Sequence, residues 1–171
     1  MRIAVVGGGS WGTAFARLTA RAGHETVLVC RDPEQARAIS AHHRNPRYLF
    51  DIELPAELRA VSLAEADLSG DELVAVAVPS RGFAATVGEL VGRLAPAPAL
   101  MSLTKGLDPA THRRMSEILG ELAPAERVAV LSGPNHAEEV ARDYAYYVEN
   151  QVRHRFGLEG VPVIIDFQSR S

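Results

Sequence analysis

Three glycines near the start of the chain have the spacing of a dinucleotide-binding loop. Gly7, Gly9 and Gly12 form the pattern G-x-G-x-x-G, directly after a short apolar run and at the beginning of an amphipathic one. The first glycine permits a tight turn from strand to helix, the second lets the backbone approach a pyrophosphate, and the third lets helix and strand pack closely. The N-terminus of such a helix presents free N–H groups to phosphates. The pattern therefore favours a dinucleotide ligand over a turn that is merely rich in glycine.

Arg31 and Asp32 follow the second predicted strand, about twenty residues past the glycines, where dinucleotide folds keep an acid for the adenosine ribose. The two side chains favour different cofactors. Asp32 would accept a hydrogen bond from the 2′-hydroxyl of NAD, whereas Arg31 would pair with the 2′-phosphate of NADP. Asp32 also precedes Pro33 and fits the N-cap of the next helix. The sequence thus predicts NAD or NADP, with NADP binding through Arg31 as a hypothesis.

Lys105 is the only lysine among the 18 basic residues of the chain. It follows a predicted strand and precedes Gly106, which places it at the edge where open α/β sheets bind ligands. A lysine there can hold a phosphate as a point charge or donate to a developing alkoxide. The alternative is a solvated surface lysine. Because arginine serves at every other cationic position, we favour the functional interpretation.

A second turn from strand to helix occurs at Gly133-Pro134-Asn135. Asn135 can cap the helix or meet a substrate hydroxyl, and on spacing alone capping is favoured. His136 is interpreted as structural or solvent-facing, and Cys30 as a small apolar residue of the sheet.

Short β-branched runs alternate with longer amphipathic ones, which is typical of a parallel sheet with helical crossovers. The predicted class is α/β, a Rossmann-like doubly wound sheet that is incomplete and is followed by a long helix and one extra strand. Strands are expected over residues 2–6, 26–30, 73–78, 99–102, 128–131 and 161–167, and helices over 12–22, 33–43, 82–94, 111–122 and 135–156. Residues 45–55 are expected to form a loop.

Composition narrows the class of protein further. The 171 residues are 47% hydrophobic and 23% charged with a net charge of −3, which indicates a soluble globular protein and argues against a basic nucleic-acid binder. A single cysteine excludes an intrachain disulfide and a multi-cysteine metal site, and the six histidines lack metal-ligand spacing. With no apolar run long enough to span a membrane and no signal-peptide pattern, we expect a cytoplasmic protein without a metal.

Five ordered blocks resemble the bacterial NAD(P)-dependent sn-glycerol-3-phosphate dehydrogenases. They are GGGSWGTAFA (7–16), NPRYLFDIELP (45–55), VAVPS (76–80), SLTKGLD (102–108) and LSGPNHAEEVA (131–141), and the resemblance covers residues 1–142, the NAD(P)-binding domain. It implies reversible reduction of dihydroxyacetone phosphate to sn-glycerol 3-phosphate, a precursor of glycerophospholipids. It also implies cofactor contacts by Ser10, Trp11, Arg31 and Ala137, a contact of Lys105 with both cofactor and substrate, and substrate contacts by Gly133 and Asn135.

The resemblance stops after Arg142, where that family continues towards a helical domain that carries its second, proton-transferring lysine. Residues 143–171 instead hold five of the ten aromatic residues and are expected to form a helix-strand tail. Residues 144–168 resemble the KH-like C-terminal end of the Der-type (EngA) tandem GTPases, which suggests a fusion of two genes.

Three functions follow from these patterns. The first is a cofactor-binding dehydrogenase domain without its helical catalytic domain, for which the isolated chain is expected to show slight or no turnover. The second is a ribosome- or RNA-associating fragment acting through the tail, although the charges of residues 144–171 cancel and the tail has no G-x-x-G clamp. The third is a structural tail, with exposed apolar surface and self-association expected.

Overall fold

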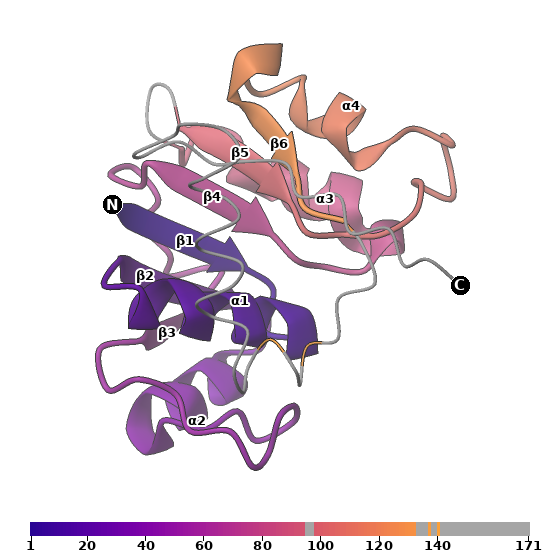
Figure 1. Cartoon of the computed structure of the whole chain (residues 1–171). Coiled ribbons are helices and arrows are strands. Elements are labelled where there is room, and N and C mark those ends of the chain that lie inside the picture. Colours follow the sequence, from indigo (N-terminus) through magenta and orange to yellow (C-terminus); the bar gives the residue numbers. More distant parts are fainter. Residues whose placement is uncertain (95–97, 133–136, 138–139, 141–171) are drawn as a thin grey trace.

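Six parallel strands form the centre of the described part of the chain. The computed structural model describes residues 1–94, 98–132, 137 and 140. The strands run in the order β3-β2-β1-β4-β5-β6 (Figure 1). Their bounds are β1 (Arg2–Val6), β2 (Glu25–Cys30), β3 (Arg59–Ser62), β4 (Leu73–Val76), β5 (Ala99–Ser102) and β6 (Val128–Val130). Because the chain builds outward from β1 to β3 and then restarts at β4, the order reverses between β1 and β4, where ligands bind in open sheets of this kind.

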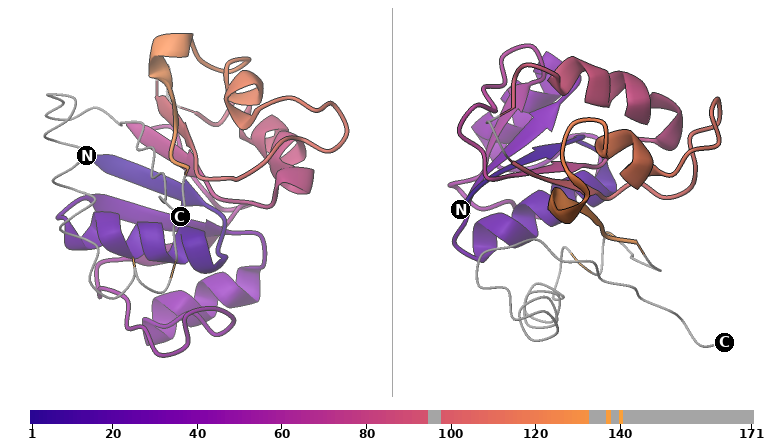
Figure 2. Two further views of the ribbon diagram at one scale, coloured as in Figure 1. Left: turned by 45° about the vertical axis from the view of Figure 1, so that its right-hand side comes forward. Right: turned by 90° about the horizontal axis from the view of Figure 1, so that it is seen from above.

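Helices cover both faces of this sheet (Figure 2). One face carries α1 (Ser10–Arg21) and α2 (Pro33–His42), and the other carries α3 (Ser80–Leu90) and α4 (Met115–Leu119), with the short 3-10 helix η1 (Ala125–Arg127) before β6. Alternate residues of β1 supply the two cores: Ile3 and Val5 join the α1 and α2 layer, and Ala4 and Val6 join the α3 and α4 layer. Phe83 of α3 is fully buried in the second layer, and burial of a side chain of this size contributes about 1.5–3 kcal/mol.

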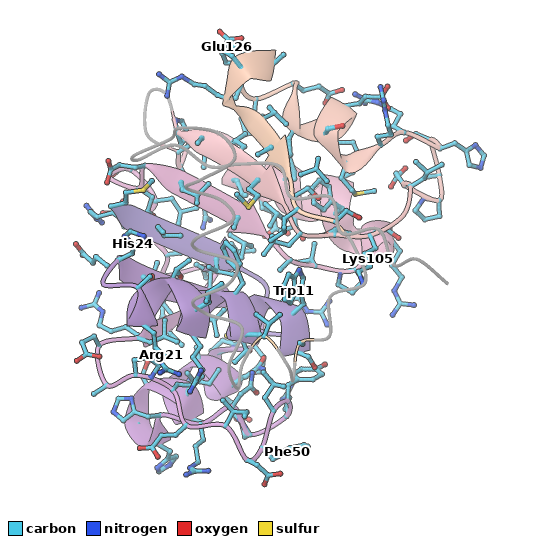
Figure 3. All side chains as sticks on the ribbon, viewed as in Figure 1. Trp11, Arg21, His24, Phe50, Lys105 and Glu126 are labelled. Carbon is cyan, nitrogen blue, oxygen red and sulfur yellow. The ribbon has the colours of Figure 1, made fainter. Side chains whose placement is uncertain are left out.

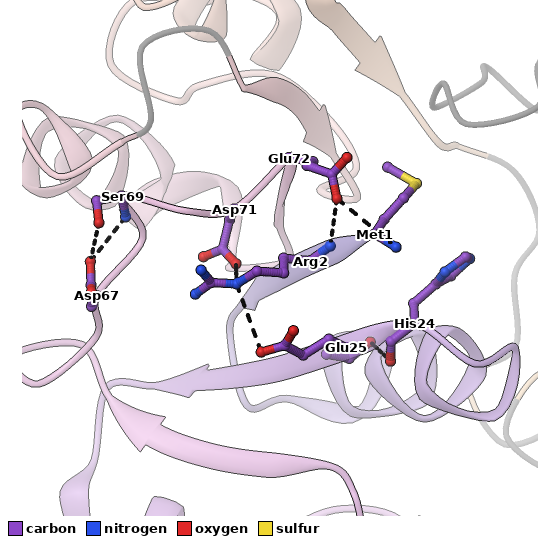
Figure 4. A network of polar contacts seen from close by, with 9 residues as sticks. Met1, Arg2, His24, Glu25, Asp67, Ser69, Asp71 and Glu72 are labelled. Carbon is purple, nitrogen blue, oxygen red and sulfur yellow. Dashed lines mark hydrogen bonds and ion pairs between the residues drawn. The ribbon is translucent and has the colours of Figure 1, made fainter.

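Ion pairs hold the amino ends of the strands together (Figure 4). The Arg2 guanidinium lies 3.7 Å from the carboxylate of Glu25 and 3.9 Å from that of Asp71. The backbone N–H of Arg2 donates to Glu72 at 2.8 Å. Burial raises the pKa of Asp71, and the charge of Arg2 opposes that rise. The amino ends of the strands lie opposite the glycine loop, which follows the carboxyl end of β1. These polar groups therefore fix β1 and β4 without taking part in the ligand-binding side of the sheet.

The strand β3 is absent from the sequence prediction. It has only four residues, RAVS, and pairs in parallel with β2 at the outer edge of the sheet. A four-residue segment with a single β-branched residue, Val61, carries too weak an alternation to be distinguished from the surrounding loop.

The predicted helix over 111–122 is wrong at both ends, because α4 spans Met115–Leu119. The carboxylate of Asp108 accepts hydrogen bonds from the N–H and the hydroxyl of Thr111, at 2.8 and 2.7 Å. His112 then takes a positive φ of 56°, and Arg114 pairs with Leu107 in an isolated bridge. This local turn competes with helix formation and delays the helix to Met115.

The remaining predictions agree with the structure within a few residues. The strands over 2–6 and 99–102 and the loop over 45–55 are confirmed. The helices expected over 12–22, 33–43 and 82–94 begin at Ser10, Pro33 and Ser80, and the strands expected over 26–30, 73–78 and 128–131 differ by one or two residues at one end. The helix over 135–156 and the strand over 161–167 lie outside the described residues.

Candidate functional site

The glycine loop joins the end of β1 to the start of α1. Gly7 has a φ of +128°, which favours glycine, and its N–H donates to the carbonyl of Val29 at 2.8 Å. A Cβ on Gly7 would lie 2.4 Å from the carbonyl oxygen of Ala77, and a Cβ on Gly12 would lie 1.9 Å from the carbonyl oxygen of Gly7. A Cβ on Gly9 would meet no atom within 4 Å. Packing inside the protein thus requires glycine at Gly7 and Gly12. The backbone of Gly9, by contrast, has free space beside it.

Ser10 and Trp11 are the first residues of α1, directly after Gly9 at the N-cap. The N–H groups in this first turn have no acceptor within the helix. Trp11 is half-buried against the core, with its ring tilted by 54° to that of Phe15 and the centroids 6.4 Å apart. Its indole Nε1 is buried and finds no acceptor among the described residues. Both predicted residues therefore lie beside the open backbone of the loop.

A buried asparagine, Asn45, ties this loop to the segment after α2. Its side-chain nitrogen donates to the carbonyl of Gly8 at 3.0 Å and to the hydroxyl of Thr13 at 2.8 Å. Its side-chain oxygen accepts from the N–H groups of Arg47 and Tyr48 at 3.0 and 3.3 Å, and from Gln35 at 3.1 Å. Asn45 begins the block of residues 45–55 that resembles the dehydrogenases, but its sequence context predicts no role for it. The available signal was an Asn-Pro pair directly after a helix, which by itself predicts only a turn.

The segment that Asn45 anchors forms one wall of a cavity of about 220 Å³. Ser10 of α1 lines one side of the cavity. The segment lines the rest of it with Arg47, Tyr48, Leu49, Phe50, Asp51 and Ile52. Tyr48 and Phe50 are 42% and 64% exposed, which is unusual for aromatic side chains in a small domain. Figure 3 shows Phe50 at the tip of this segment, beyond α2. The cavity therefore joins the start of α1 to an apolar rim.

Both oxygens of the Asp32 carboxylate have partners. One oxygen accepts from the backbone N–H of Glu34 at 2.9 Å, so Asp32 caps α2 as its spacing predicts. The other is paired with the guanidinium of Arg47. The N–H of Glu34, followed by the charge of Arg47, holds the pKa of Asp32 below its ordinary value. Arg31 beside it is exposed and has no ion pair within the described residues.

Lys105 lies after the carboxyl end of β5, as predicted, and its side chain is exposed. Thr104 before it is buried, and its hydroxyl donates to the carbonyl of Val78 at 2.7 Å, joining the ends of β5 and β4. Gly106 after it has a φ of +88°, which turns the chain away. Figure 3 shows Lys105 and Trp11 at the same edge of the sheet, with Arg21 and His24 at the other. The structure thus brings Lys105 to the side of the sheet that holds the glycine loop.

Of the predicted contact residues after β6, only Ala137 belongs to the described part of the chain. Ala137 is half-buried and packs against the core on the α1 side, whereas Gly133 and Asn135 fall outside the described residues. His136 falls outside them as well.

Cys30 is fully buried in β2, as its interpretation as an apolar residue predicts. Burial, with a smaller contribution from Asp32, raises the pKa of its thiol to about 12. Within the described ranges, no three His, Cys, Asp or Glu side chains are grouped as a metal site would require. None of the helices described combines the length and the apolar composition that crossing a bilayer requires.

A parallel sheet whose order reverses beside an open glycine loop defines a Rossmann-like nucleotide-binding domain. Comparison with known proteins narrows this class. Residues 2–149 match the family model described as NAD-dependent glycerol-3-phosphate dehydrogenase N-terminus, and the chain belongs to this family. The resemblance seen in the five sequence blocks is therefore confirmed, and the match extends to residue 149, seven residues beyond the limit expected at Arg142.

The chain is similar to curated glycerol-3-phosphate dehydrogenases (NAD(P)+) that are about twice as long. It is 47% identical over 147 residues to that of Nocardia farcinica, covering 82% of this chain and 44% of the relative. It is 46% identical over 139 residues to that of Pseudomonas savastanoi pv. phaseolicola, covering 81% and 40%. The crystal structure of glycerol-3-phosphate dehydrogenase from Coxiella burnetii matches with a TM-score of 0.75 and 26% identity, covering 98% of this chain and 54% of that one. The chain thus spans less than half the length of these curated relatives. The likeness of residues 144–168 to the Der-type GTPases stays a prediction, on residues outside the described part.

Proposed function

We propose that this chain binds NAD(H) or NADP(H) as the cofactor half of a glycerol-3-phosphate dehydrogenase that interconverts dihydroxyacetone phosphate and sn-glycerol 3-phosphate. The observation that carries the proposal is the unequal packing of the three glycines. Gly7 and Gly12 are closed in by backbone atoms, whereas the space above Gly9 is empty to 4 Å. A glycine kept where the protein itself has room for a side chain fits the close approach of a ligand's pyrophosphate.

The described residues fit this cofactor. The backbone from Gly7 to Gly9 and the first turn of α1 at Ser10 and Trp11 would hold the pyrophosphate, since the N-terminus of α1 favours negative charge. Arg31 would contact the adenosine ribose or its 2′-phosphate, and Ala137, which packs against the core on the α1 side, would contact the cofactor. When bound, the cofactor supplies or accepts the hydride.

The substrate contacts are proposed at Lys105, Gly133 and Asn135. Dihydroxyacetone phosphate and sn-glycerol 3-phosphate both carry a phosphate, and the Lys105 ammonium is an exposed cation at the edge of the sheet that carries the glycine loop. It can hold that phosphate or donate to the oxygen on which negative charge develops. Residues 1–171 match less than half the length of the curated dehydrogenases. We expect little turnover from these residues alone, because the general acid–base group that the resemblance places elsewhere contributes about 10² to 10⁴ in rate, and substrate positioning contributes more.

The test is binding of NADH and NADPH by calorimetry to the wild type and to Gly9→Ala. The φ of −78° and ψ of −178° at Gly9 are open to alanine, and the added Cβ meets nothing, so the variant should fold as stably as the wild type. Its cofactor affinity should fall at least about tenfold, because the methyl occupies the space of the pyrophosphate. Gly88→Ala in α3, which also meets nothing within 4 Å, is the matched control and should bind normally. A wild type that binds neither dinucleotide, or a Gly9→Ala variant that binds as the wild type does, contradicts the proposal.

The tail of residues 143–171 is a separate proposal. Its aromatic content and its likeness to the end of the Der-type GTPases support an origin by fusion and a structural role with self-association. Sedimentation of the whole chain at increasing concentration tests the self-association, and a gel shift with ribosomal RNA at low salt tests the RNA alternative. A cytoplasmic location is proposed from the unpaired cysteine, and cell fractionation tests it.

A further inference from the structure

Arg47 contacts the position at which dinucleotide folds discriminate NAD from NADP. An acid at the end of the second strand normally accepts the 2′-hydroxyl of the adenosine ribose. Here that acid is Asp32, and its two oxygens are taken by the N–H of Glu34 and by the Arg47 guanidinium. A ribose hydroxyl can use this carboxylate only by displacing Arg47. The arrangement therefore weakens the usual preference for NAD.

Arg47 is also held in place from its backbone. Its N–H donates to the buried Asn45 side chain at 3.0 Å, and Asn45 in turn binds the carbonyl of Gly8 in the glycine loop. The guanidinium itself remains half-exposed, at 53%, and lines the cavity that begins at Ser10. The Arg47 backbone is thus fixed while its guanidinium stays accessible. This guanidinium contacts Asp32, where the ribose is expected, and lines the same cavity as Ser10 at the start of α1.

Resting on the function proposed above, we propose that Arg47 is a specificity-determining residue that, with Arg31, binds the 2′-phosphate of NADP(H). Arg31 precedes Asp32 in the chain, is exposed, and has no ion pair within the described ranges. On binding, Arg47 exchanges the Asp32 carboxylate for the phosphate, which its planar fork matches equally well. Two guanidinium groups and one carboxylate at this position leave a net positive charge, which favours a dianionic phosphate over a hydroxyl.

The experiment compares the dissociation constants of NADPH and NADH, with adenosine 2′,5′-bisphosphate and AMP as a second pair that isolates the 2′-phosphate. In the wild type, NADPH and the bisphosphate should bind more tightly than their partners. Arg47→Ala should weaken both phosphorylated ligands about tenfold, which is the effect of one charge-assisted hydrogen bond. NADH and AMP should change by less than about twofold, because Asp32 becomes free to accept the ribose hydroxyl. Arg47→Lys keeps the charge without the fork and should fall between these values.

Arg44→Ala is the matched control. Arg44 lies in the same segment and pairs with Glu53 at 3.6 Å, so its removal makes the same change in net charge away from Asp32. It should change all four ligands equally and by less than about twofold, as expected of a screened surface charge. Equal effects of Arg47→Ala on the phosphorylated and unphosphorylated ligands, or effects matched by Arg44→Ala, overturn the inference while the cofactor proposal stands. If the wild type binds neither NADH nor NADPH, the cofactor proposal itself fails.

Discussion

Asn45 is the residue whose replacement should weaken both the stability of the fold and the binding of the cofactor, because its side chain joins the glycine loop to the Arg47 segment. Replacing it with alanine removes five hydrogen bonds, to Gly8, Thr13, Gln35, Arg47 and Tyr48. Some of these partners keep or gain another hydrogen bond when the Asn45 side chain is removed. The carbonyl of Gly8 keeps the Gln35 amide at 2.7 Å, and the N–H groups of Arg47 and Tyr48 lie near the surface, where water can reach them.

The expected loss of stability follows from the bonds that nothing replaces. Each net hydrogen bond contributes about 1 kcal/mol, and with two or three of the five uncompensated or left buried we expect Asn45→Ala to cost about 3 kcal/mol. For a domain of this size, about 3 °C of melting temperature corresponds to each kcal/mol, so the midpoint should fall by about 10 °C. Loosening of the glycine loop and of the Arg47 segment should in addition weaken NADPH binding about fivefold or more.

Thermal unfolding and calorimetric titration with NADPH, at a temperature where both variants are folded, measure the two effects. Ser40→Ala is the control, because the Ser40 hydroxyl makes two hydrogen bonds to the backbone of Ala60 at 2.9 Å, joining α2 to β3 away from the glycine loop. It should cost about 1 kcal/mol, because Ser40 is exposed and water can replace part of the two hydrogen bonds, and it should leave the affinity for NADPH unchanged. The reasoning is refuted if Asn45→Ala loses no more stability than Ser40→Ala, or if its affinity for NADPH equals that of the wild type.

Three further predictions follow from packing and ionisation. Gly12→Ala should lower the free energy of unfolding in denaturant by about 3 kcal/mol and abolish cofactor binding, since its Cβ meets the Gly7 carbonyl at 1.9 Å; a stability equal to that of Gly9→Ala would contradict this. Because burial raises the pKa of Asp71, the folded chain keeps this proton where the unfolded chain has lost it, so the carboxyl costs stability as pH rises from about 4. The melting temperature of Asp71→Asn should therefore rise relative to the wild type between pH 4 and neutrality, and a constant difference would count against the buried carboxyl. The Cys30 thiol, with its pKa raised to about 12, should resist alkylation at neutral pH in the folded chain and react fully in denaturant, and rapid labelling of the folded chain would show that the β2 end opens.

The sequence predicts the parts of this site that depend on local constraints. The glycine spacing, the N-cap at Asp32 and the strand end before Lys105 each follow from residues within a few positions of one another. The structure places all three at one edge of the sheet, because parallel strands end on the same side. Asp32 caps the helix with one oxygen, as its spacing predicts, and its other oxygen pairs with Arg47. Its role toward the adenosine ribose stays a prediction.

The sequence does not predict contacts between residues far apart in the chain. Asn45 is 37 positions from Gly8 and Arg47 is 15 from Asp32, and no spacing rule links either pair. The same limit explains the missing β3, whose four residues become a strand only through pairing with β2. A buried polar side chain in an irregular segment is visible only once the packing around it is known.

These long-range contacts also explain why the segment after α2 matters to a site built on α1 and β2. A loop loses conformational entropy when it is ordered, and Asn45 and Arg47 offset that cost by binding the glycine loop and the Asp32 carboxylate. The ordered segment then holds Tyr48 and Phe50 exposed at the rim of the cavity, where apolar surface is expected to serve binding. Affinity and cofactor choice therefore depend on the same few hydrogen bonds. A change at Asn45 should weaken binding of the cofactor in general, whereas a change at the Arg47 head group should weaken NADP(H) and leave NAD(H) nearly unchanged.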